Sequence, residues 1–90
     1  MMVTFTYSAW NVEAVASVKV DLPMIPPPLA GIYFTYLDTV LQVFGEPFME
    51  ITPTEYSGTV VSVRAYRSLS PEEETNLLDD MKRAGWVMED

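Results

Sequence analysis

Residues 3–22 alternate between apolar and polar side chains, and this alternation constrains the fold more than any other feature of the sequence. Successive side chains of a β-strand point to opposite faces, so a period of two predicts strands buried on one face. The apolar positions are odd-numbered in residues 3–9 and mainly even-numbered in residues 12–22. A turn near Trp10 or a β-bulge produces such a change of phase. We favour a hairpin over one bulged strand, because a strand of 20 residues is unusually long.

The next segment, Pro28 to Phe44, is predicted to be a helix. It follows a proline-rich crossover at residues 22–28, its apolar residues recur at helical spacing, and Gly45 stands where a helix would end. The apolar arc is wider than one contact with a sheet requires. Its many Tyr, Phe, Thr and Val residues have low helix propensity, so a pair of strands remains the alternative.

Two strands and a second helix are predicted in the remainder. Phe48 to Thr52 is a short strand candidate that Pro53 ends or confines to a sheet edge, and Thr59 to Arg67 is a clearer one. The pattern Ser70-Pro71-Glu72-Glu73 predicts a helix start with a capping box. Gly85 is placed to end this helix.

The predicted order is therefore strand, strand, helix, strand, strand, helix. Hairpins separated by helices predict a single α+β domain over residues 1–90, with an antiparallel sheet of about four strands and two helices packed on it.

Composition excludes several classes of function. The chain has no Cys and no His, which excludes zinc sites built on these residues, Cys or His nucleophiles, and iron–sulfur clusters. Thirteen acids and five bases give a net charge of −8, which disfavours direct binding to nucleic acid or an anionic membrane. No apolar run approaches the ~20 residues that span a membrane. We expect a cytoplasmic protein with no cofactor, no metal site and no membrane partner.

Carboxylates are the only acid–base candidates, and we interpret them as capping and solvated groups. No apolar neighbours along the chain would force their burial. We therefore predict no catalytic residue and no enzyme, with a small two-carboxylate enzyme as a remote alternative. Glu74 stands apart, because its helical angle turns it towards the sheet. It is expected either to pair with Arg64 or Arg67, or to be a partly exposed first-turn acid.

The C-terminal region concentrates negative charge, with seven acids and two bases in residues 72–90. Such a surface attracts basic proteins, including those that bind nucleic acid. Its second interpretation is that it only keeps the protein soluble. The predicted partner-binding acidic face consists of Glu72, Glu73, Asp79, Asp80, Glu89 and Asp90.

The chain also has more large apolar side chains than a small core needs. The wide apolar arc of Pro28 to Phe44 predicts a self-association surface that involves Phe34 and Leu41, and hence a homodimer. A structural or assembly subunit that self-associates through this segment or through a sheet edge is accordingly the alternative function.

In size, charge and lack of catalytic residues, the chain resembles the small acidic inhibitors that phages encode against host defence or nucleic-acid enzymes. The resemblance lies in these gross properties and in no motif. It implies a non-enzymatic binding module that acts in the host cytoplasm. Such a module docks on a larger basic protein and offers carboxylates where phosphates would bind.

Overall fold

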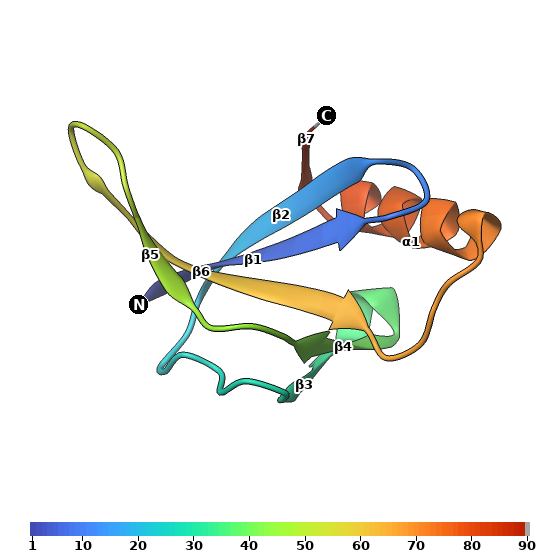
Figure 1. Cartoon of the computed structure of the whole chain (residues 1–90), viewed down its shortest axis with the longest axis horizontal. Helices are drawn as coiled ribbons and strands as arrows, with labels where there is room; N and C mark the ends of the chain where they lie inside the picture. The colour runs from blue at the N-terminus through green and yellow to red at the C-terminus, as the bar shows by residue number, and fades with distance from the viewer. Residues whose placement is uncertain (90) are drawn as a thin grey trace.

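The structure, a computed structural model, describes residues 1–89 apart from the side chains of residues 56 and 57. Within these residues the chain forms one mixed seven-stranded sheet and one α-helix (Figure 1). The strands are β1 (Met2–Ala9), β2 (Ala14–Asp21), β3 (Gly31–Phe34), β4 (Thr39–Val43), β5 (Phe48–Ile51), β6 (Tyr56–Ala65) and β7 (Val87–Glu89). The helix is α1 (Pro71–Arg83), and a 3₁₀ turn, η1 (Thr35–Leu37), joins β3 to β4.

The sheet order is β3-β4-β6-β1-β2-β7, and the seventh strand, β5, also pairs with β6. β1 and β2 form the expected antiparallel hairpin, with Phe5 opposite Val18. β1 and β6 are parallel, with Phe5 beside Val61, and the other strand pairs are antiparallel. The predicted antiparallel sheet of about four strands with two helices is therefore wrong. Parallel neighbours need a long crossover, which no local pattern in the sequence marks.

The helix predicted for Pro28 to Phe44 is also wrong, because this segment forms β3, η1 and β4. The buried residues Phe34, Leu37 and Leu41 are three and four positions apart, which imitates the spacing of a helix face. That spacing arises because the turn at η1 ends with Asp38 in the left-handed conformation and shifts the alternation of β4 relative to β3. The β-branched and aromatic composition decides in favour of strands.

The second predicted helix is confirmed at both ends. The hydroxyl of Ser70 accepts a hydrogen bond from the Glu73 amide, and the Glu73 carboxylate accepts one from the Ser70 amide. Gly85 adopts a positive φ of 101° after the last turn. The Trp86 amide then donates to the Met81 carbonyl at 3.0 Å, which folds Trp86 back towards the helix.

The core lies on the face of the sheet that α1 covers. The inner side chains of β1 pack there with Leu77, Leu78 and Met81 of α1. Phe34 contacts the rings of Phe5 and Trp86 edge-on, with centroids 5.7 and 5.6 Å away. The Trp86 indole donates a hydrogen bond to the Tyr36 hydroxyl, so the segment after β3 meets the segment before β7. No helix in the described part of the chain is long and apolar enough to cross a membrane.

Candidate functional site

The acidic face predicted from the sequence lies mainly on α1. Glu72 and Asp79 are exposed and form no ion pair with any described residue. Asp80 lies 3.7 Å from the Arg83 guanidinium. Glu89 lies on β7, at the edge of the sheet, and Asp90 falls outside the described residues. Four of the six predicted residues, those at 72, 73, 79 and 80, thus share one helix.

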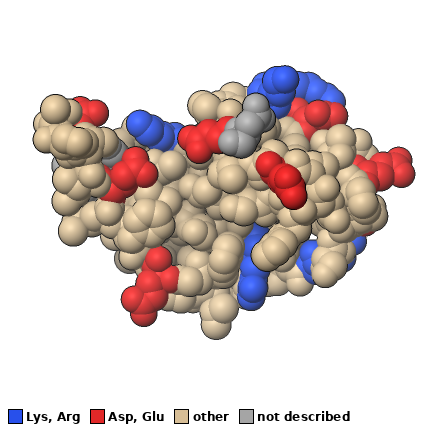
Figure 2. All heavy atoms as spheres, turned by 45° about the horizontal axis from the view of Figure 1, so that its top comes forward, with Lys and Arg blue, Asp and Glu red and all other residues tan. Residues whose placement is uncertain are grey.

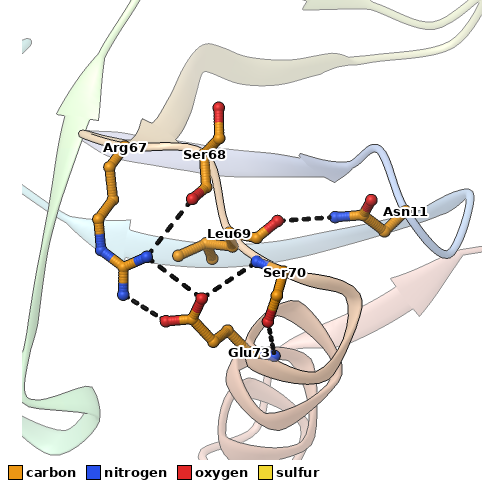
Figure 3. Close-up of polar contacts among 6 residues, drawn as sticks. All are labelled: Asn11, Arg67, Ser68, Leu69, Ser70 and Glu73. Atoms are coloured by element: carbon orange, nitrogen blue, oxygen red, sulfur yellow. Dashed lines mark hydrogen bonds and ion pairs between the residues drawn. The ribbon is translucent and has the colours of Figure 1, made fainter.

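Glu73 is already engaged within the molecule (Figure 3). Its carboxylate forms a two-pronged ion pair with Arg67 and also accepts the hydrogen bond from the Ser70 amide. The hydrogen bonds to Arg67 and to the Ser70 amide lower the pKa of Glu73 from 4.5 to about 2. Glu73 therefore holds the loop before α1 in place, and less of its charge is available to a partner.

On the face of the molecule that Figure 2 shows, the carboxylates are dispersed rather than gathered into one patch. Figure 2 shows one face of the molecule, where acidic atoms lie at several separate places with basic atoms between them. A surface of this kind attracts a basic partner at long range through its net charge. The detailed contact needs a second feature besides charge.

Glu74 faces the sheet, as its helical angle predicted, but its partners and its exposure differ from the prediction. It is 4% exposed and bonds neither Arg64 nor Arg67. The Tyr7 hydroxyl donates to Glu74 Oε2 at 3.0 Å, and the Asn11 backbone amide donates to Oε1 at 2.7 Å. Burial, reinforced by this hydrogen bond, raises the pKa of Tyr7 above its usual value of 10.0. The helical angle of Glu74 was the available signal, whereas its partners lie 63 and 67 positions away.

A groove of about 790 Å³ opens beside this cluster, where the β1–β2 turn faces the end of β6. Its walls include Trp10, Tyr66, Arg64 and Arg67. The Arg64 guanidinium lies 5.3 Å from the centre of the Phe44 ring, and Arg67 is held by Glu73. Both cations in the walls thus have partners within the molecule. Among the described residues, no group of three or more acids could hold a metal ion.

Residues 46–55, here called the β5 arm, form the most exposed apolar element of the sheet. Figure 1 shows this hairpin projecting away from the body of the molecule. Phe48, Met49 and Ile51 are 53%, 67% and 69% exposed. The arm also carries three exposed carboxylates and no base, namely Glu46, Glu50 and Glu55. Pro53 predicted that the strand ends there or lies at an edge, and β5 both ends at Ile51 and lies at an edge. The acidic and apolar character of the arm was not predicted, although residues 46–55 show it directly.

Phe34 and Leu41, the residues predicted for self-association, belong to the core instead. They are 6% and 0% exposed, so neither offers a contact surface in the folded chain. The exposed helical face on which that prediction depended does not exist. Self-association through another surface stays a prediction.

No protein-family model matches this chain, and no curated protein or solved structure shows significant similarity to it. Its function therefore has to be inferred from its own residues.

Proposed function

We propose that this protein is a small, non-enzymatic binding module that docks on a larger basic protein. The observation that carries the proposal is the β5 arm, where Met49 and Ile51 on one face of the strand and Phe48 on the other are exposed, along with three carboxylates of the arm. Exposed apolar clusters rimmed by polar groups are typical of protein–protein contacts. A strand that only completed a solvated sheet would not need Phe48, Met49 and Ile51 on its surface.

Charge supports a basic partner. The net charge of −8 raises the local concentration of basic proteins and repels phosphates. Glu72 and Asp79 of α1, which form no ion pair with any described residue, add a second acidic surface to that of the arm. We extend the proposal to a phage-type inhibitor that competes with nucleic acid for a basic site on its partner. This finer role is supported only by the charge and by the resemblance in size and composition.

The burial of Glu74 supports the choice of binding over catalysis. Among the described side chains it is the one buried carboxylate, and both of its oxygens accept hydrogen bonds from neutral donors. Hydrolysis by two carboxylates needs a second carboxylate beside the first, about 5–10 Å away across the substrate. The other acids of α1 are exposed and serve as caps or surface charges.

The proposal is tested by affinity capture from the native host, followed by mass spectrometry and by binding measurements with the recovered partner. We expect a basic protein that dissociates as salt rises, because the screening length falls from about 10 Å at 0.1 M to about 3 Å at 1 M. Displacement by a short DNA or RNA duplex would support competition with nucleic acid. Recovery of this chain alone would contradict the proposal and favour an assembly subunit.

A triple variant of α1 distinguishes two roles of its acidic residues, namely attraction of the partner and solubility of the protein. Reversal of Glu72, Asp79 and Asp80 to Lys should slow association more than it speeds dissociation, since charges at the rim act mainly on the association rate. The fold should be little affected, because exposed charges contribute little individually. Salt-insensitive binding that the triple reversal leaves unchanged would show that the acidic face of α1 serves solubility only.

A further inference from the structure

β5 is an edge strand whose outer side pairs with no strand in the described part of the sheet. It bonds to the first half of β6, with Phe48 opposite Val60 and Glu50 opposite Gly58. Beyond Ile51, the Thr52 amide donates to the Glu55 carbonyl at 2.9 Å and closes the hairpin. An exposed edge presents unpaired backbone N–H and C=O groups, and a further extended segment can bond to them.

The two faces of β5 differ in chemistry. Phe48 and Glu50 share one face, while Met49 and Ile51 share the other, because side chains alternate along a strand. The register shift beyond Glu50 leaves the extra residue on β6, so β5 itself keeps its alternation. A complementary strand would therefore place basic side chains beside Glu50 and apolar side chains beside Met49 and Ile51.

Charge selects the occupant of this edge. Two copies of the chain paired through β5 would bring three carboxylates of each arm together, with no base in either arm. Like charges opposite one another destabilise a strand pair, whereas opposite charges stabilise it. A second copy is thus disfavoured, and a basic segment of another protein is favoured.

We infer that the outer edge of β5 receives an extended, basic and apolar segment of the partner protein as an additional strand. This inference rests on the proposed function, because it names where and how the basic partner binds. Backbone hydrogen bonds along β5 supply the pairing, and Glu50 with its apolar neighbours supplies the selectivity.

The test uses synthetic peptides and amide hydrogen exchange of the full chain, followed by NMR. The probe is a capped eight-residue peptide of alternating Lys and Val. One control replaces every Lys by Glu, and a second replaces two Val by Pro, which keeps the charge but interrupts the ladder. At ten times the dissociation constant of the probe, every second amide of residues 48–51 should exchange about tenfold more slowly. The alternation is expected because the other amides of β5 already bond to β6.

Matched variants locate the contact. Glu50→Lys should abolish this protection, while Glu72→Lys makes the same change of charge on α1 and should leave it intact. Both residues are exposed, so both variants should fold, and their amide spectra check this.

Protection that the proline control reproduces, or that grows with protein concentration alone, would overturn the inference. So would binding that perturbs α1 and leaves β5 unchanged, or no binding of the probe at millimolar concentration. Capture of a basic protein by the Glu50→Lys variant would keep the proposed function while rejecting the site on β5.

Discussion

The hydroxyl of Tyr7 donates a hydrogen bond to the Glu74 carboxylate at 3.0 Å, in the buried space between the centre of the sheet and the first turn of α1. The other carboxylate oxygen accepts a hydrogen bond from the Asn11 backbone amide, and the Asn11 side chain donates one to the Leu69 carbonyl at 3.1 Å. The strand β1, the turn after it and the start of α1 are thus tied together by polar groups. This relationship fixes where the helix begins relative to the sheet.

We expect Glu74→Ala to lower the free energy of unfolding by about 2–3 kcal/mol. The substitution leaves the buried Tyr7 hydroxyl and the partly buried Asn11 amide without their acceptor, and a fully buried unsatisfied group costs about 1–3 kcal/mol. Urea denaturation measures the loss. Glu72→Ala is the matched control on the same helix turn, where an exposed acid should change stability by less than about 0.5 kcal/mol. Equal losses in the two variants would contradict the buried role of Glu74.

Tyr7 should make the protein sensitive to alkali. Burial and the Glu74 carboxylate raise the pKa of Tyr7 above 10.0 in the folded state. Above pH 10 the unfolded chain loses the proton that the folded chain keeps, so stability falls as pH rises. Tyr7→Phe removes this dependence, and its stability should fall less steeply than that of the parent protein between pH 9 and pH 11. Urea midpoints at each pH provide the comparison, and parallel curves would refute the prediction.

Phe34 tests the strand assignment of the segment predicted as a helix. Its ring contacts those of Phe5, Tyr36 and Trp86, so Phe34→Ala should cost about 3–5 kcal/mol. Tyr33→Ala is the neighbouring control, because that side chain is exposed on the opposite face of β3 and should cost about 1 kcal/mol or less. A small loss for Phe34→Ala would mean that this ring is not part of the core.

Local patterns predicted those elements whose structure is determined by neighbours in the chain. The hairpin of β1 and β2 followed from the change of phase near Trp10. The capping box at Ser70 and the end at Gly85 followed from residues within a few positions of each other. Pro53 marked the end of a strand that indeed lies at a sheet edge.

Long-range pairing was not predictable from these patterns. The parallel contact of β1 with β6 joins residues more than fifty positions apart, such as Phe5 and Val61. The Glu74 cluster depends on that pairing, because Tyr7 and the end of β6 must first lie side by side. The helix prediction for the segment of β3 and β4 was wrong for a different reason. The turn between two short strands produced a helical spacing of apolar residues by coincidence.

Substitution of Ser70 tests whether the capping box predicted from the local sequence stabilises α1. Ser70→Ala removes the hydroxyl that accepts a hydrogen bond from the Glu73 amide at 3.1 Å. The substitution should lower the free energy of unfolding by about 1 kcal/mol. Thermal or urea denaturation measures this. Ser68→Ala is a suitable control, because Ser68 is exposed and lies before the cap. If Ser70→Ala denatures like the parent protein, the cap does not stabilise the helix.

The ion pair between Arg67 and Glu73 should contribute stability that is lost in acid. Its hydrogen bonds lower the folded-state pKa of Glu73 from 4.5 to about 2, so folding favours the charged form. The contribution is therefore complete above about pH 5 and declines as pH falls towards 2, where the folded carboxyl also takes up a proton. Arg67→Gln removes the larger cause of the shift. Its deficit in stability should be present at pH 6 and should shrink towards zero near pH 2.

The deficit should be small throughout, because the pair is exposed and solvent screens it, and added salt should reduce it further. Lys19→Gln removes the same charge from β2, where Lys19 forms no ion pair with a described residue. The difference in stability between Lys19→Gln and the parent protein should therefore not shrink between pH 5 and pH 2 as the deficit of Arg67→Gln does. Identical acid profiles for the two variants would show that net charge, rather than the contact of Arg67 with Glu73, determines the acid response.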